Sequence, residues 1–315
     1  MTDTRNGSLL SAGWRRLLVA KRYVIWLYVI NLALGLAATA SLGPRLGAVL
    51  DSSLYSGRLV HGFDLGTFME LATKPEVVRG SQMPASLLLA IAFLVVEIFF
   101  VGGILAEYLA VARLQRSRFY AACGENFWKM VRLAIPFTIA AGITVGILHG
   151  IRTGLGKAFE YSPHERSAFA VQCGMLFIEA LALLWVRMWF DLAQTDTVVS
   201  GERAIRRSAR RGWTHARAGG LYRGYFALAV LTAAVIMLGG WFWWSFALAS
   251  RVFVSFIILQ IILFCILAIR WWQRALAVAW WERRAPVPAP EPMVVTEPAV
   301  IVTPPATLPS PEPAT

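Results

Sequence analysis

Charged residues are scarce in this sequence, and their scarcity excludes a soluble globular protein. Asp, Glu, Lys and Arg make up only 15% of the 315 residues, whereas 57% of the residues are hydrophobic. A soluble domain of ordinary composition carries about 25% charged residues. The apolar residues are also collected in long continuous runs. The composition therefore predicts an all-α, polytopic membrane protein, because helices satisfy their own backbone hydrogen bonds inside a bilayer.

Cysteine and histidine are also rare, and the motifs of common enzyme classes are missing. The three cysteines are odd in number and scattered, so no disulfide framework is implied. No HExxH, GxSxG, P-loop or Gly-rich dinucleotide pattern occurs, which favours a non-catalytic protein over an enzyme, with no cofactor. Four residues of metal-ligand type map to the predicted outer side without metal-binding spacing, and ordinary surface roles are favoured for them. They are His61, Asp64, His149 and His164.

Acidic residues are outnumbered by basic ones, 18 against 30, which gives a net charge of +12. The basic residues fall in the loops between the apolar runs, so they are explained as topology determinants and contacts with anionic lipid headgroups. Nucleic acid is therefore not an expected partner. By the positive-inside rule, the arginine-rich loops mark the cytoplasmic face of what we expect to be a bacterial inner membrane.

Six apolar runs are long enough to cross roughly 30 Å of hydrocarbon at about 1.5 Å per residue. They cover residues 23–42, 85–112, 133–151, 167–189, 225–248 and 252–272. Alternating loop charge places both chain ends in the cytoplasm, with a charge-balanced loop 43–84 outside and a basic loop 191–223 inside. The outer loop is expected to hold one or two amphipathic helices. The run Ala38-Thr39-Ala40 also matches a signal-peptidase site, so cleavage after Ala40 is an alternative.

Three further segments surround the predicted spans. Residues 1–22 form a basic, amphipathic stretch suited to the inner membrane interface. The loop 191–223 is expected to hold a cationic helix along the inner surface. Its predicted headgroup contacts are Arg203, Arg206, Arg207, Arg210 and Arg211. Residues 285–315 hold ten of the fifteen prolines and are expected to be a disordered tail, either a spacer or a docking strip for a proline-reading protein.

Ionisable groups within the predicted spans are the main candidates for function. Glu97 and Glu179 each lie twelve residues from the outer end of an inward-running span, so we expect them at similar depth. The competing interpretation is that both are hydrogen-bonded in a packed bundle, with Asn31 and Gln260 among the available partners. Nearer the cytosolic boundary, an ion-pair cluster is expected. Its predicted members are Glu107, Arg187 and Asp191.

With the spans placed, three short segments carry a resemblance to known membrane proteins. They are Phe190-Asp191-Leu192-Ala193, the basic segment 202–211, and the run Leu-Val-His-Gly-Phe-Asp at 59–64. On these segments the chain resembles uncharacterised six-helix bacterial inner-membrane proteins. It is also similar in layout to the membrane domain attached to some glycerophosphoryl diester phosphodiesterases. The resemblance covers the membrane portion only, and it implies an architecture and no reaction.

Two functional hypotheses follow from these features. The first is a non-catalytic scaffold or accessory subunit of an envelope or lipid-handling assembly. The alternative is a permease or ion-coupled transporter, in which a polar cavity reaches both Glu97 and Glu179. An intramembrane enzyme would require the outer-side histidines and Asp64 to converge within metal-binding distance.

Overall fold

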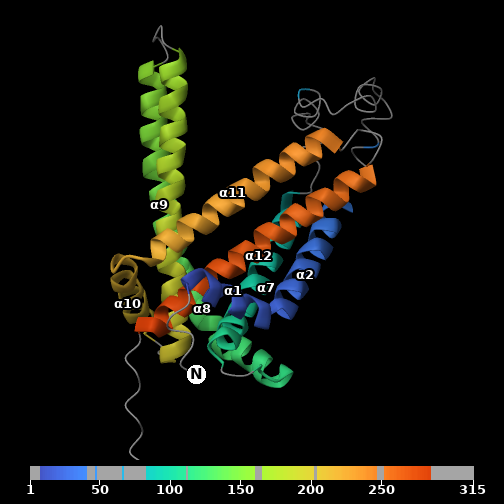
Figure 1. Ribbon diagram of the computed structural model, residues 1–315, viewed down its shortest axis with the longest axis vertical. Helices are drawn as coiled ribbons and strands as arrows, with labels where there is room; N and C mark the ends of the chain where they lie inside the picture. The colour runs from blue at the N-terminus through green and yellow to red at the C-terminus, as the bar shows by residue number, and fades with distance from the viewer. Residues whose placement is uncertain are drawn as a thin grey trace, which may run out of the picture. The chain divides into compact units, whose positions relative to one another are not determined.

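The structure of the chain, a computed structural model, describes residues 8–40, 83–110, 113–159, 165–201, 204–246 and 252–284, together with single residues at 47 and 66. These residues form eight helices (Figure 1). They are α1 (Leu9–Val19), α2 (Lys21–Ala40), α7 (Met83–Leu109), α8 (Arg116–Phe159), α9 (Glu165–Ser200), α10 (Ile205–Arg217), α11 (Leu221–Phe246) and α12 (Val252–Arg284). The prediction of an all-α fold is confirmed.

Six of the described helices are long and apolar enough to cross a membrane: α2, α7, α8, α9, α11 and α12. The protein is therefore a multi-pass membrane protein. Most of the predicted outer loop 43–84 and the whole predicted tail 285–315 lie outside the described residues. The expectations for these two segments stay predictions.

Three helices continue well beyond the predicted spans. Helix α8 begins at Arg116 rather than near Leu133, α9 runs on to Ser200, and α12 runs on to Arg284. The segment 191–223 is accordingly not one loop, because its first ten residues belong to α9. Hydropathy marks where the hydrocarbon ends, but a helix can continue past that point where its polar side chains find partners in the protein.

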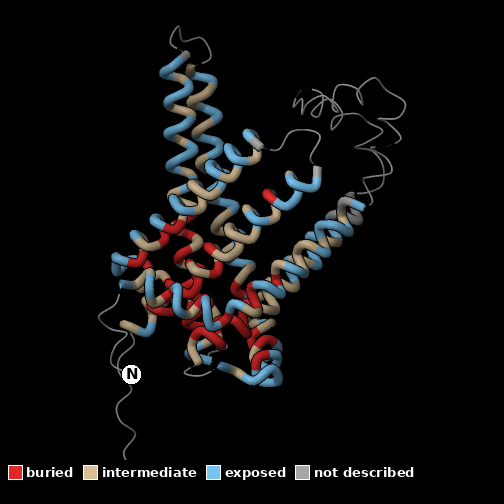
Figure 2. The backbone as a smooth tube through the Cα atoms, turned by 45° about the vertical axis from the view of Figure 1, so that its right-hand side comes forward, coloured by how far each residue is buried: buried red, intermediate tan, exposed pale blue. Residues whose placement is uncertain are grey.

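Buried residues gather at one end of the helices, which we call the core end (Figure 2). The core end comprises the start of α2, the end of α7, the start of α8, the end of α9, the start of α11 and the end of α12. Under the predicted topology it is the cytoplasmic end. Toward the other ends, large apolar side chains such as Ile139 and Ile147 of α8 and Leu238 of α11 are exposed. Exposed apolar side chains of this kind are suited to contact with the hydrocarbon chains of lipids.

Helix α1 packs into the core end rather than standing apart from it. The Ser8 hydroxyl caps its first turn by accepting a hydrogen bond from the Ser11 amide. Gly13 faces α12 so closely that an added Cβ would lie 3.2 Å from the Leu276 backbone nitrogen. The Trp272 indole donates to the Leu10 carbonyl at 3.0 Å. The amphipathic N-terminal segment therefore uses one face to pack against the bundle.

Helix α10 packs against the end of α9 through small residues. Ser208, Gly212 and Ala216 recur every four residues and are buried. A Cβ added to Gly212 would lie 2.9 Å from the Ala193 backbone nitrogen, so only glycine permits this approach. The Trp189 indole donates to the Ala209 carbonyl at 2.8 Å across the same interface.

The arginines of α10 divide between solvent and protein. Arg206, Arg207 and Arg210 are exposed, whereas Arg211 forms an ion pair with Asp196 of α9, with Nη2 2.9 Å from Oδ2. Arg203 lies outside the described residues. Arg211 thus helps to hold α10 on α9, and the expected headgroup contacts of the other arginines stay predictions.

Candidate functional site

A cavity of about 460 Å³ is lined by residues of α2, α7, α9, α11 and α12. Much of its lining is apolar and includes Phe93, Leu184 and Trp271. Its polar and charged lining comes from all five helices. These residues are Asn31, Glu97, Arg187, Thr232, Arg270 and Gln273. The volume falls within the range of about 300–1,000 Å³ that is typical of small-molecule sites.

Asp191 lies next to this cavity and is the most densely paired acid at the core end. Its side chain is fully buried. The Tyr225 hydroxyl donates to Asp191 Oδ2 at 2.8 Å, and Arg270 Nη1 donates to the same oxygen at 3.3 Å. Arg274 Nε lies 3.6 Å from Oδ1. A buried carboxylate is tolerable only when it is paired in this way.

Arg274 connects Asp191 to the acid that lines the cavity. Its Nη2 donates to Glu97 Oε1 at 3.1 Å, and its guanidinium lies 4.4 Å from the centre of the Trp271 ring. Only 4% of the Arg274 side chain is exposed. Together with Tyr225 and Arg270, these residues form what we call the Asp191 network: Glu97, Asp191, Tyr225, Arg270 and Arg274.

Arg187 has a different environment from the arginines of the Asp191 network. It lines the cavity one helical turn before Asp191 on α9. Its Nε is shielded from solvent and has no hydrogen-bond partner. Among the residues that the structure describes, no carboxylate forms an ion pair with it within 4.0 Å. The cavity therefore presents an arginine whose charge no neighbouring side chain pairs directly.

Of the predicted cluster, Glu107 lies apart from Arg187 and Asp191, which are one helical turn apart on α9. Glu107 pairs with Arg22 of α2, with Oε1 3.4 Å from Nη2, and its Oε2 accepts from the Leu114 amide at 3.1 Å. Asp191 pairs with Arg270 and Arg274 as described above. Glu107 therefore belongs to an ion pair that is separate from the Asp191 network.

The two acids predicted at mid-membrane are also in different surroundings. Glu97 lines the cavity, but Glu179 is not among the described residues that line it. Glu179 instead approaches Arg152 of α8, with 3.9 Å between Oε2 and Nη1, in the antiparallel pair of α8 and α9 (Figure 1). Of the predicted polar neighbours, Asn31 lines the cavity. Gln260 accepts a hydrogen bond from Tyr28 at 2.9 Å and so links α12 to α2.

Several residues of the site were missed by sequence analysis. They are Tyr225, Arg270, Gln273 and Arg274. A usable signal was present, because Arg270 and Arg274 are one helical turn apart and fall at the predicted depth of Asp191. Two arginines at the depth of a single acid could have suggested an ion-pair network.

The metal-ligand candidates do not form a site in the described part of the chain. No group of three His, Cys, Asp or Glu side chains that could hold a metal occurs among these described residues. His149 contacts Arg152, with Nδ1 3.0 Å from Nη2. His61, Asp64 and His164 lie outside the described residues.

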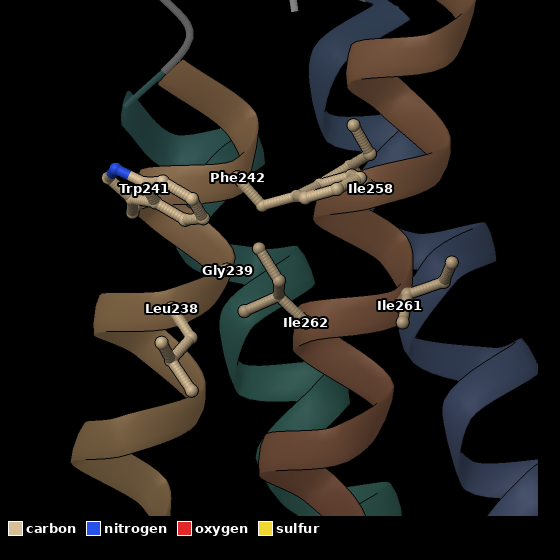
Figure 3. Close-up of a pocket in the computed structure, with 7 residues that line it drawn as sticks. All are labelled: Leu238, Gly239, Trp241, Phe242, Ile258, Ile261 and Ile262. Carbon is tan, nitrogen blue, oxygen red and sulfur yellow. The ribbon is translucent and has the colours of Figure 1, made fainter. Parts of the chain in front are cut away.

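A second cavity, of about 360 Å³, lies between α11 and α12 away from the core end (Figure 3). Its lining is aliphatic and aromatic and includes Leu238, Phe242, Ile258 and Ile262. The Ile262 side chain reaches toward Gly239, where an added Cβ would lie 2.6 Å from Cδ1 (Figure 3). No charged side chain is among the described residues that line it, so this cavity offers no charge that could orient an ionic ligand.

The cavity beside the Asp191 network is therefore the candidate functional site. It combines an apolar wall with charged and amide side chains, which can bind and orient a small molecule. It contains no pairing of nucleophile and general base among the described residues that line it. Comparisons with known protein families, with curated proteins and with solved structures find no match for this chain.

Proposed function

We propose that the protein is a permease that binds a small polar solute in the cavity lined by Arg187, Arg270 and Glu97. The observation that carries the proposal is the polar lining contributed by five helices. Polar and charged groups inside a membrane protein are costly, and they are retained where they line a solute or ion pathway. A scaffold that acts through its surfaces has no need of such a cavity.

The ion pairs of the Asp191 network support the same proposal. They join α7, α9 and α12 through side chains, and Arg274 contacts both Glu97 and Asp191. A cation placed between two acids can exchange partners when the helices shift, which gives the bundle two possible arrangements. In the alternative put forward from the sequence, Glu97 and Glu179 acted together. In the present proposal only Glu97 acts at the cavity.

The proposal also concerns the membrane in which the protein lies and the orientation of the protein in that membrane. We place the protein in a bacterial inner membrane, with the core end in the cytoplasm. The exposed arginines of α10 at the core end support this orientation under the positive-inside rule. The layout resemblance to six-helix bacterial membrane proteins belongs to the same proposal, as does the tail 285–315 as a docking strip for a protein partner.

Cysteine accessibility tests whether the cavity opens to water on both sides. Cys123, Cys173 and Cys265 are first replaced by Ala, and Thr232→Cys is introduced into the cavity wall. A membrane-impermeant methanethiosulfonate reagent is then added to right-side-out and inside-out vesicles, because thiolates react with it in water. We expect labelling from both sides, at different rates.

The matched control is Val230→Cys, which lies on the same helix at an exposed, apolar position. It should stay unlabelled in both vesicle preparations, since its side chain would face lipid. Labelling of Thr232→Cys from neither side, or from one side only, contradicts a permease. The one-sided result would favour an accessory protein with a binding site.

A further inference from the structure

We infer that the solute of this cavity is an organic anion whose carboxylate or phosphate group is bound by Arg187 and Arg270. The inference rests on the proposed function and names its substrate class.

The charges around the cavity do not balance. Three guanidinium groups, those of Arg187, Arg270 and Arg274, accompany two carboxylates, those of Glu97 and Asp191. A cation that is left unpaired within an apolar bundle is unfavourable unless another group compensates it. One further negative charge in the cavity would complete the set.

The surplus charge is on the two arginines that line the cavity, Arg187 and Arg270. Arg274 is almost fully buried between Glu97 and Asp191, so these two carboxylates already compensate its positive charge. Within the described part of the chain, Arg270 has one ion-pair contact, the 3.3 Å contact with Asp191, and it lines the cavity. Arg187 also lines the cavity and has no carboxylate partner among the described residues. Because a guanidinium offers five N–H donors, both can bind a further oxyanion.

A cationic solute is not favoured by the same geometry. Glu97 is the acidic residue among those that line the cavity, and Arg274 already donates to it at 3.1 Å. An entering cation would have to displace that arginine while lying near Arg187 and Arg270. The two guanidinium groups would repel the positive charge of such a solute, and this repulsion is larger where water is excluded.

The remaining walls indicate that the anion carries an apolar body. Phe93, Leu184, Leu267 and Trp271 line the cavity beside the arginines. Apolar walls stabilise a hydrocarbon or aromatic group by removing it from water. An anionic group on an apolar body occurs both in water-soluble organic acids and in acids derived from the membrane. The two sources therefore need separate tests.

The first test compares charged reagents at Thr232→Cys in the cysteine-free background. A methanethiosulfonate that carries a sulfonate is compared with one that carries a trimethylammonium group, each normalised to its rate with a free thiol. We expect the anionic reagent to be favoured by about tenfold, because a cationic cavity concentrates anions. Arg187→Gln should abolish the preference and Arg187→Lys, which keeps the charge, should retain it.

The control variant is Arg223→Gln, which removes an exposed arginine from α11, the helix that carries Thr232. It should leave the preference unchanged, and thermal unfolding of each variant checks that the bundle is intact. Equal rates, or faster reaction of the cationic reagent, overturn the anion inference while aqueous access still supports a permease. No reaction with either reagent overturns the proposed function itself.

The second test identifies the source of the anion with the purified full-length protein. Thermal unfolding is followed with laurate and benzoate, and with their cationic counterparts dodecylamine and benzylamine. A rise in Tm with laurate alone supports a membrane-derived acid, and a rise with benzoate supports a water-soluble one. In either case Arg187→Gln should remove the rise. No rise with either anion, or an equal rise with the matching amine, overturns the inference.

Discussion

Arg274 Nε on α12 lies 3.6 Å from Asp191 Oδ1 on α9, and the two side chains are 4% and 0% exposed. This pair joins two helices that are far apart in the sequence at the end of the bundle where most buried residues gather. Buried ion pairs are weak evidence for net stability. The removal of one partner alone is strongly destabilising, because it leaves a buried charge unpaired.

Replacement of Asp191 by Asn should destabilise the protein by about 3–5 kcal/mol, because Arg270 and Arg274 would lose their shared buried carboxylate. The measurement is unfolding by denaturant in detergent. The control is Glu282→Gln, which breaks a partly exposed pair with Arg16 and should cost about 1 kcal/mol or less. Equal effects of the two substitutions would show that the Asp191 network is not the stronger constraint.

Tyr225→Phe should remove a single hydrogen bond and leave the packing of the ring unchanged. The Tyr225 hydroxyl donates to Asp191 Oδ2 at 2.8 Å, and both groups are buried. Loss of a donor to a buried carboxylate should cost about 1.5–3 kcal/mol in free energy of unfolding. Tyr222→Phe is the matched control on the same helix, because its hydroxyl donates to the Leu181 carbonyl at a part-buried site. A larger loss in the control than in Tyr225→Phe would contradict the assignment.

Sequence analysis could place the acids in depth but could not place them around the helix axes. Glu97 and Glu179 were expected at one level, yet only Glu97 lines the cavity, and Glu179 approaches Arg152. Hydropathy follows the run of residues through the bilayer, and nearly every face of such a helix is apolar. The direction of each side chain is then decided by helix packing, which a single sequence does not record.

The apolar pattern of α10 indicated only one part of the face by which the helix packs. A cationic helix was expected within residues 191–223, and a helix is found at Ile205–Arg217. Its buried stripe is Ser208, Gly212 and Ala216. The larger apolar residues beside that stripe also pack, because Ile205 and Ala209 contact the cluster that contains Phe190 and Ala193. The small residues permit the close approach of the two helices, and a pattern of large apolar residues does not mark them.

Gly212→Leu should detach α10 from α9. Any side chain at this position meets the Ala193 backbone at 2.9–3.0 Å, and a backbone cannot move aside as a flexible side chain can. We expect a fall in Tm and faster proteolysis in the connection that follows Ser200. Gly174→Leu is the matched control, because it lies at an exposed position of α9 with no heavy atom within 4 Å of an added Cβ. Equal protease resistance of wild type and Gly212→Leu would contradict the close packing of these helices.

The exposed arginines of α10 should bind anionic lipid headgroups from the core end of the bundle. Arg206 and Arg210 point away from the face that packs on α9, and each basic residue near an anionic surface contributes about 1 kcal/mol. The double variant Arg206→Gln with Arg210→Gln should retain fewer phosphatidylglycerol molecules in native mass spectrometry than the wild type. The matched control removes two exposed basic residues at the opposite ends of α8 and α9, through Lys157→Gln with Arg166→Gln. Since both double variants change the net charge by the same amount, a loss of lipid confined to the α10 variant assigns the binding to that helix. Equal losses would instead indicate a general effect of charge.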